Sequence, residues 1–344
     1  MTVHRHVSLG QDILFLDGLT GTGKTMMVSI LGSFDRVELV RFEHSYEYLF
    51  ILSYLELLDA ESASSLASLY ADLATYNSHI GREVNLRPSD LSGAYGNSKL
   101  LLTLARLFRK DGPSVAVDIA RNRPILNVLT HQALGVLGPA FESLGRRLRV
   151  VEMVRHPLFL IEHWYSYVDR FGNDALDFTV WIKNREVMPW FAYGWEVEYQ
   201  ELNKMDRVIY SIHRLTEMAE ATVARLPAER RDQVLLVPFE KFVLDPDPFL
   251  AQIAQLIGSN RGPGTSRAMR RQKVPRTAVL AGPRKPIYER YGWKFGKSEV
   301  SASDELERRM EFVEKRASPE GSAMLRLACD KYETRFGRWY DGDA

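Results

Sequence analysis

The sequence predicts an α/β fold in which five mostly parallel strands lie between two helical layers. Short apolar or β-branched runs alternate with longer segments of helical spacing, and this alternation builds parallel sheets covered on both faces. The first run leads directly into a glycine-rich loop and a helix, as in a phosphate-binding βα unit. The predicted strands are residues 13–16, 37–40, 115–117, 150–154 and 234–237.

Helical spacing accounts for most of the remaining chain. A helix is expected from Lys24 onward, and others at residues 44–76, 98–109, 124–144, 158–169, 208–226, 248–257 and 304–336. The length of 344 residues suits one large domain. We therefore predict a single domain over 1–344, with a helical and aromatic insertion at about 170–205 and a basic mobile loop at about 260–300.

The loop after the first strand carries the strongest functional signal. It matches Gly-x-x-x-x-Gly-Lys-Thr, the Walker A pattern. The glycines let the chain curl so that backbone N–H groups point at phosphate oxygens, and the following helix turns its positive dipole end to the same anion. A lysine reaches the β- and γ-phosphates, and a threonine hydroxyl binds Mg²⁺. The predicted nucleotide-binding residues are Gly18, Thr20, Gly21, Thr22, Gly23, Lys24 and Thr25.

Composition limits the cellular setting and the partners. The net charge is +1, so no global field attracts nucleic acid or an anionic membrane. The single cysteine, Cys329, excludes an intramolecular disulfide and fits a reducing compartment. Neither a signal-peptide core nor an apolar run of transmembrane length is seen. A cytoplasmic protein without an integral membrane segment is expected.

Residues that follow the predicted strands are candidates for chemistry, because ligands bind at the carboxyl ends of parallel strands. Asp118 follows the third predicted strand and would hold Mg²⁺ or act as a general base, or else cap the next helix. Glu43 follows the second and would accept a proton, or be ordinary loop chemistry. Arg155 follows the fourth and suits an oxyanion or a phosphate, or a surface ion pair.

Two further segments have a functional and a plain interpretation. A basic stretch would close over the nucleotide or simply be a solvated loop; its residues taken as nucleotide contacts are Arg267, Arg270, Arg271, Arg284 and Lys285. Aromatic residues are dense between Trp164 and Tyr199. They would line an acceptor pocket, or pack in the core, which is the commoner use of such side chains.

Residues 12–259 resemble the sulfotransferase family. Besides the loop, the segment from Val150 to Pro157 resembles the family's strand ending in Arg-x-Pro, and Val234 to Pro246 resembles its valine-rich strand followed by Asp-Pro. The resemblance implies a sulfotransferase-like P-loop fold and a 3′-phosphate site that includes Arg155. The family's serine eight residues later is His163 here, so Ser166 one turn further would replace it, with Arg284 and Lys285 completing the site.

The loop departs from the family pattern. Gly21 occupies the position of the family's basic residue, and Lys24 lies three residues later, as in nucleoside triphosphate enzymes. This difference favours a kinase that uses Mg²⁺-ATP to phosphorylate a hydroxyl of a small molecule or glycan. Lys24 and Arg155 would contact the transferred group, Thr25 and Asp118 would hold Mg²⁺, and Asp118 or Glu43 would be the base.

Two alternatives remain at this stage. The first is a sulfotransferase that uses 3′-phosphoadenosine 5′-phosphosulfate (PAPS) and releases adenosine 3′,5′-bisphosphate (PAP), acting on a carbohydrate or small-molecule hydroxyl. The second is a regulatory nucleotide-binding NTPase. The first alternative, like the kinase, needs a nucleotide donor and a hydroxyl-bearing acceptor.

Overall fold

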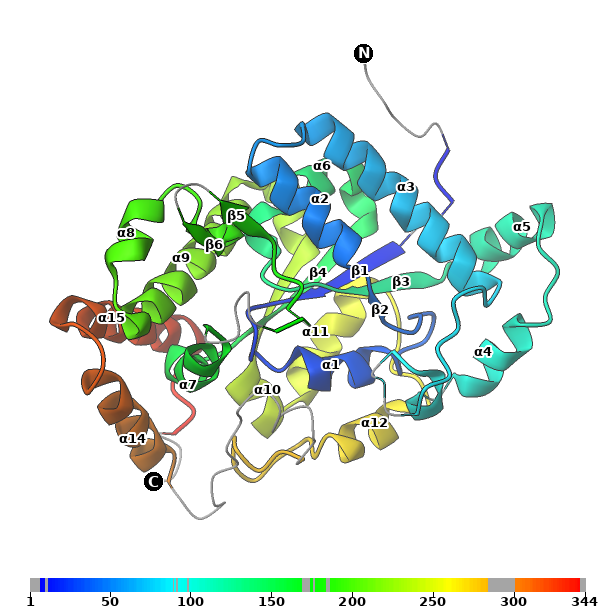
Figure 1. Cartoon of the computed structure of the whole chain (residues 1–344). Coiled ribbons are helices and arrows are strands. Elements are labelled where there is room, and N and C mark those ends of the chain that lie inside the picture. The colour runs from blue at the N-terminus through cyan, green and yellow to red at the C-terminus, as the bar shows by residue number, and fades with distance from the viewer. Residues whose placement is uncertain are drawn as a thin grey trace.

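The computed structural model describes residues 7–9, 12–88, 90, 92–97, 99–168, 174–175, 177–183, 186–283 and 301–340. It confirms the predicted fold class, since a five-stranded sheet lies between two helical layers (Figure 1). The sheet order is β2-β3-β1-β4-β7 and every pairing is parallel. The strands are β1 (Asp12–Asp17), β2 (Arg41–Phe42), β3 (Ile125–Leu129), β4 (Leu148–Val154) and β7 (Val234–Pro238).

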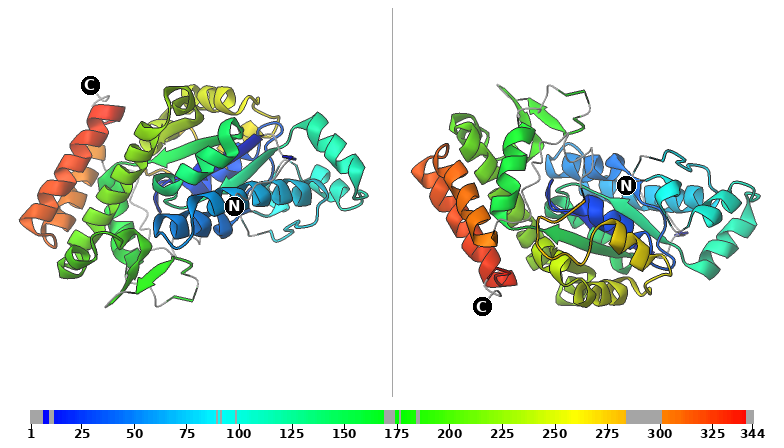
Figure 2. Two further views of the ribbon diagram at one scale, coloured as in Figure 1. Left: turned by 90° about the horizontal axis from the view of Figure 1, so that it is seen from above. Right: turned by 90° about the horizontal axis from the view of Figure 1, so that it is seen from below.

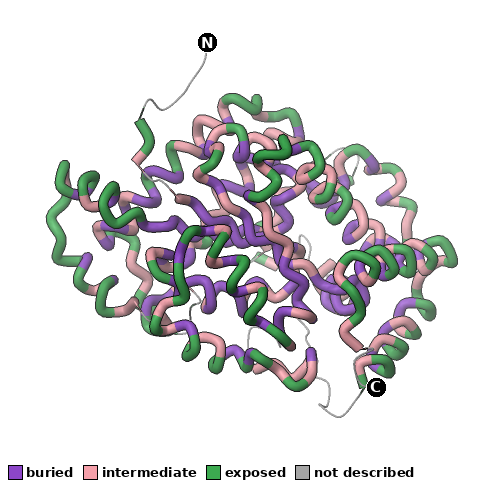
Figure 3. Tube along the Cα trace, turned by 180° about the vertical axis from the view of Figure 1, so that it is seen from behind, coloured by how far each residue is buried: buried purple, intermediate pink, exposed green. Residues whose placement is uncertain are grey.

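Alternate residues of the central strands face different helical layers, as the period of a strand requires. Ile13 and Phe15 of β1 pack into one hydrophobic cluster, and Leu14 and Leu16 into the other. All four are fully buried, and the strands occupy the buried centre of the molecule (Figure 3). The paired register sets Asp17 beside Glu152 on one face at the carboxyl ends of β1 and β4.

The two layers differ in size (Figure 2). The smaller layer contains α1 (Lys24–Leu31), α10 (Phe239–Leu244), α11 (Asp247–Ile257) and α12 (Thr265–Arg271). The larger contains α2 (His44–Tyr54), α3 (Ala60–His79), α6 (Gly138–Leu144), α7 (Pro157–Val168), α9 (Lys204–Arg225), α14 (Ala302–Glu314) and α15 (Pro319–Phe336). Helices α4 (Leu100–Arg106) and α5 (Pro113–Asn122) lie at the opposite end of the molecule from α14 and α15.

Two predicted strands are wrong. Residues 115–117 belong to α5, which begins at Pro113. The helix buries Val115 and Ile119, and this spacing of four residues is that of one helical face. The third strand is instead Ile125–Leu129, which is buried at every position; the sequence analysis had placed these residues in a helix. Residues 37–40 form no strand either, and the edge strand is Arg41–Phe42.

Two predicted long helices are each divided. The predicted helix 44–76 is interrupted before Asp59, whose side chain accepts a hydrogen bond from Ser62 N at 2.8 Å and begins α3. The predicted helix 304–336 is interrupted before Ser318, which accepts from Gly321 N at 2.9 Å and begins α15. Both are ordinary N-caps, and Pro319 at the first helical position marks the second.

The aromatic insertion is mainly structural. It contains the hairpin β5 (Trp181–Lys183) and β6 (Val187–Pro189), followed by α8 (Glu196–Glu201). Trp190, Phe191 and Trp195 are buried in the larger hydrophobic cluster, so the core interpretation holds for them. The free Cys329 is also buried. Among the described residues, no helix combines the length and apolarity needed to cross a membrane.

Asp206 connects the start of α9 to the start of α15. Its side chain is 2% exposed and accepts hydrogen bonds from Asn203 Nδ2 at 2.6 Å and from Ser318 N at 3.0 Å. The carboxylate therefore satisfies a backbone donor at the first turn of α15. Gly321 is packed against it, since a Cβ there would lie 2.1 Å from Asp206 Oδ1.

We predict that Asp206→Ala lowers the free energy of unfolding by about 1–3 kcal/mol, because it leaves buried donors without an acceptor. Urea unfolding followed by circular dichroism measures the change. Asp330→Ala, at an exposed position of α15, is the control and should change stability by less than about 0.5 kcal/mol. Equal effects of the two substitutions would contradict the role given to Asp206.

Candidate functional site

The Gly18–Thr25 loop is tightly curled at its glycines. Gly18, Gly21 and Gly23 have φ angles of 138°, 98° and 97°, a region that favours glycine. A Cβ on Gly18 would lie 2.3 Å from Met153 O, and one on Gly23 would lie 2.4 Å from Phe239 Cδ2. Helix α1 begins at Lys24. The structure therefore confirms a curled loop that leads into a helix N-terminus, where an anion is favoured.

Three side chains hold the loop through its backbone carbonyls. The Thr22 hydroxyl donates to Leu19 O at 2.8 Å, Trp164 Nε1 donates to Thr20 O at 2.8 Å, and Arg155 Nη1 donates to Gly21 O at 2.8 Å. Because Trp164 and Arg155 come from α7 and from the end of β4, the loop conformation is tied to the rest of the fold.

Lys24 is buried within this arrangement. Its Nζ donates to Gly18 O, and to Leu19 O at 3.0 Å. Burial lowers the pKa of Lys24, while the carboxylates of Asp17, Glu152 and Glu47 act in the opposite direction. Burial also raises the pKa of Asp17, and the pKa of Glu152 rises well above its usual value through burial and the neighbouring Asp17 charge. Lys24 thus lies among acidic side chains at the end of the central strands.

A second cluster adjoins the loop and was missed by the sequence analysis. His131 follows β3, and His44 and Glu47 lie on the first turn of α2 after β2. His131 Nδ1 lies 3.0 Å from Glu47 Oε1, and His44 Nδ1 lies 3.6 Å from the same oxygen. The charge of Glu47 also acts on Lys24. Gln132, next to His131, donates its backbone N–H to Gly18 O at 3.2 Å, so the cluster lies beside the Gly18–Thr25 loop.

Glu47 fixes the orientation of the His131 ring through the contact at Nδ1. Burial would raise the pKa of Glu47, but the charges and hydrogen bonds of His131 and His44 outweigh it and lower this pKa to about 2. The hydrogen bond to Glu47 likewise raises the pKa of His44. An ionised carboxylate only accepts hydrogen bonds, so neutral His131 carries its proton on Nδ1. Its Nε2 is then the nitrogen that can accept a proton.

The same cluster has the composition of a metal site. One ligand atom from each of His44, Glu47 and His131 lies within 4.8 Å of the others. Two imidazoles and a carboxylate suit Zn²⁺ or another divalent transition metal better than Mg²⁺. The cluster is therefore chemically able to act as a base or to hold such a cation.

Arg155 lies beside the loop as predicted. It is 7% exposed, and its Nε is 3.6 Å from Glu240 Oε1. Its guanidinium stacks on Phe239 at 4.4 Å, and Arg276 stacks on the same ring at 5.4 Å. Burial lowers the pKa of Arg155 to about 10, so it remains cationic at neutral pH. Two arginines and Phe239 thus form a cationic position next to the loop.

Other predicted residues have different outcomes. Thr25 lies half-buried at the start of α1. Glu43 is paired with Arg41 at 2.9 Å, while the carboxylate in contact with His131 is that of Glu47, one turn later. Ser166 lies half-buried on α7, three residues after His163, whose ring lies against Gly21. Its part in a 3′-phosphate site remains a prediction.

Asp118 requires a correction. It lies on α5, not at a strand end, and pairs with Arg121 at 2.6 Å and with Arg109 at 3.7 Å. The reason is the misplaced third strand, whose true carboxyl end carries Thr130 and His131. Neither the metal-binding nor the catalytic role predicted for Asp118 follows from this position.

The predicted basic loop is partly helical. Arg267, Arg270 and Arg271 lie on α12, which belongs to the same helical layer as α1. Their nucleotide contacts remain predictions. Arg284 and Lys285 lie outside the described residues.

Comparison with known proteins adds fold likeness only. No family model matches the chain, and no curated protein matches it. Solved structures that resemble it include the sulfotransferase domain of the Synechococcus PCC 7002 olefin synthase, with 13% identity, a TM-score of 0.43, and coverage of 91% of this chain and 98% of that one. The sulfotransferase domain from the curacin biosynthetic pathway has 12% identity, a TM-score of 0.40, and coverage of 91% and 100%.

A sulfotransferase from Alicyclobacillus acidocaldarius has 12% identity, a TM-score of 0.34, and coverage of 94% and 97%. These proteins belong to the family that the sequence resembles.

We predict that Gly23→Ala removes nucleotide binding and lowers the free energy of unfolding by about 1–3 kcal/mol. The alanine would be strained at φ 97° and would meet the Phe239 ring. Thermal shift with nucleotides and urea unfolding measure the two effects. Gly138→Ala is the matched control, because a Cβ there has nothing within 4 Å. Normal nucleotide binding by Gly23→Ala would contradict the loop assignment.

A second prediction concerns acid stability. Because the folded pKa of Glu47 is lowered to about 2 from 4.5, its contribution is present above pH 4.5 and is lost as the pH falls toward 2. Compared with Glu47→Gln, the wild type should lose an extra amount on the order of 3 kcal/mol over this range. Urea unfolding at several pH values tests this, with exposed Glu61→Gln as control. Parallel pH profiles for the wild type and Glu47→Gln would contradict it.

Proposed function

We propose that the protein is a nucleotide-dependent transferase that moves a small anionic group to a hydroxyl, with His131 as general base. The observation that carries the proposal is the position of the His131–Glu47 pair. The pair lies at the carboxyl ends of β2 and β3, and the residue after His131, Gln132, donates its backbone N–H to Gly18 O of the loop at 3.2 Å. A phosphate-binding loop beside a carboxylate-oriented imidazole supplies the donor position and the base that such a transfer needs.

Each residue has a distinct part in this proposal. The loop N–H groups and the start of α1 would hold the phosphate of the donor. Lys24 would leave the carbonyls of Gly18 and Leu19 and neutralise charge that develops on the leaving phosphate. His131 Nε2 would take the acceptor proton, while Glu47 keeps the other ring nitrogen protonated and stabilises the imidazolium that forms. Arg155 would place a second positive charge next to the loop.

For the transferred group, we propose sulfuryl as the first candidate, with PAPS as donor and PAP as product. Support comes from Arg155 and Arg276, which stack on Phe239 beside the loop and suit a second phosphate of such a donor. The His131–Glu47 pair, acting as general base and orienting carboxylate, also needs no metal ion. The carboxylate expected to hold Mg²⁺ with Thr25, Asp118, lies on α5.

Phosphoryl transfer from Mg²⁺-ATP remains the second candidate. It is favoured by the Lys24–Thr25 pair at the start of α1, the arrangement in which a lysine meets β/γ-phosphates and a hydroxyl meets Mg²⁺. The two candidates share the loop, the base and a hydroxyl acceptor, and differ in the donor and in the need for a metal.

Thermal shift with three ligands separates the donors. PAP, ATP with Mg²⁺, and ATP with a chelator are compared, because binding to the folded state raises the melting temperature. Stabilisation by PAP above that by ATP with Mg²⁺ is expected. The reverse order, dependent on Mg²⁺, would assign the phosphoryl candidate instead. Lys24→Ala should lose the response to either nucleotide, and its full retention would refute both.

We predict that His131→Ala lowers the turnover rate by about 10²–10⁴-fold, the usual contribution of a general base, while nucleotide binding is retained. Product nucleotide release in the presence of a panel of hydroxyl acceptors measures the rate. Glu47→Gln should lower it less and shift its pH profile, and exposed Glu61→Gln serves as control. Activity that disappears with a chelator and returns with Zn²⁺ would assign His44, Glu47 and His131 to a metal site instead.

A further inference from the structure

Helix α15 contacts the end of β4, where Arg155 lies. Tyr332 of α15 donates its hydroxyl hydrogen to Glu240 Oε2 at 2.6 Å, and Glu240 is the acidic partner of Arg155. The next residue of the helix, Glu333, places its Oε1 3.3 Å from His156 Nε2. Two adjacent residues of α15 therefore hold the two residues that follow β4, one directly and one through Glu240.

Glu240 is the link between Tyr332 and Arg155. Its side chain is fully buried, and its Oε1 lies 3.6 Å from Arg155 Nε. The backbone N–H of His156 donates to the two carboxylate oxygens at 3.3 and 3.4 Å. Tyr332 adds a shorter hydrogen bond to Oε2 alone. Because this bond fixes the rotation of the carboxylate, Oε1 is the oxygen that faces Arg155.

The position of Arg155 depends on this carboxylate because other arginines lie near it. Burial lowers the pKa of Arg155, the charges of Arg309 and Arg276 lower it further, and the charge of Glu240 opposes them. Without an anion in the right place, the Arg155 guanidinium would be repelled by its neighbours. A change in the Glu240 orientation, which Tyr332 controls, should therefore move the guanidinium.

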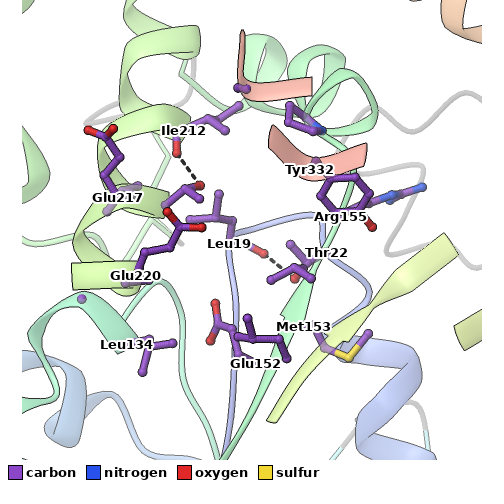
Figure 4. Close-up of a pocket in the computed structure, with 18 of the residues that line it drawn as sticks. Leu19, Thr22, Leu134, Glu152, Met153, Arg155, Ile212, Glu217, Glu220 and Tyr332 are labelled. Atoms are coloured by element: carbon purple, nitrogen blue, oxygen red, sulfur yellow. Dashed lines mark hydrogen bonds between the residues drawn. The ribbon is translucent and has the colours of Figure 1, made fainter. Parts of the chain in front are cut away.

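Tyr332 also forms part of the wall of the donor site. It lines a cavity of about 440 Å³ together with Arg155 and with Leu19 and Thr22 of the loop (Figure 4). The proposed function has the loop bind one phosphate of the donor and Arg155 the second. The cavity therefore belongs to that donor site, and α15 supplies one of its sides.

We propose that Tyr332 is a positioning residue of the donor site, a role that rests on the proposed function. Through Glu240 it fixes the Arg155 guanidinium where the second phosphate of the nucleotide binds. Tyr332 thereby sets the preference of the site for PAP over a nucleotide that has only the 5′-phosphate. The 5′-phosphate itself is bound by the loop N–H groups and the start of α1, so its affinity depends less on Tyr332.

Isothermal titration calorimetry of the full chain with PAP and with adenosine 5′-monophosphate (AMP) tests this role, because the two ligands differ only in the 3′-phosphate. The wild type is expected to bind PAP at least tenfold more tightly than AMP. Tyr332→Phe, which keeps the ring and removes the hydroxyl, should weaken PAP binding at least fivefold and AMP binding less than twofold. Tyr199→Phe, at another buried tyrosine, is the matched control and should weaken neither.

The outcomes separate this proposal from the function on which it rests. An unchanged preference for PAP in Tyr332→Phe, or an equal loss of PAP and AMP affinity, overturns the positioning role and leaves the sulfuryl candidate in place. A wild type that binds PAP no more tightly than AMP overturns both.

A double variant shows whether Tyr332 acts through Arg155. In the Arg155→Ala background, adding Tyr332→Phe should change PAP affinity less than twofold, because residues that act through one another are not additive. Glu240→Gln, which removes the charge and keeps the size, should repeat the selective loss of PAP affinity. Circular dichroism confirms that each variant folds. Additive losses of PAP affinity in the double variant overturn the proposal.

Discussion

The site depends on the interaction of the Lys24 ammonium group with the carboxyl groups of Asp17 and Glu152 at the ends of β1 and β4. Buried without anionic partners, the ammonium group would be strongly disfavoured. Asp17 and Glu152 lie side by side through the parallel register of these two strands, and both act electrostatically on Lys24. The sheet register therefore determines which charges surround the loop lysine, and through them the conformation in which Lys24 contacts Gly18 and Leu19.

Residues from the neighbouring strands and helices hold the loop in the same conformation. Arg155 and Trp164 fix loop carbonyls from β4 and α7, and Glu240 after β7 holds Arg155 in turn. On the side of β2 and β3, the Glu47 carboxylate contacts His131 and its charge acts on Lys24. Every strand of the sheet thus contributes a residue at its carboxyl end, and the proposed base and the loop share one electrostatic network. In the proposed transfer, such a network would hold the donor and the base in fixed positions relative to each other, which lowers the entropic part of the barrier.

The parts that the sequence predicted correctly are those encoded locally. The glycines of the loop, the strand that leads into it and the start of α1 follow from a short motif with its flanking pattern. Arg155 was found because it directly follows a strand rich in valine. The third strand was missed because Val115 and Val117 look as strand-like as residues 125–129, and only packing distinguishes them.

The misplaced third strand explains why the His131–Glu47 pair was not predicted. His131 and Glu47 are separated by 84 positions, and they meet only because β2 and β3 are neighbours in the sheet. The signal that could have found them is the Thr-His pair directly after an apolar run bounded by Pro124. The helix caps Asp59 and Ser318 could likewise have been predicted from an Asp and a Ser before good helix formers, but the continuous helical spacing on both sides concealed them.

Phe239 has a further consequence for how this chain can change over evolutionary time. Its ring fills the space where any side chain at position 23 would begin, and it also supports Arg155 and Arg276. A descendant that exchanged Gly23 would first need a smaller residue at position 239, and that step would release both arginines. Positions 23 and 239, far apart in the chain, are therefore expected to constrain each other, because a change at either one alone disturbs the packing of the loop.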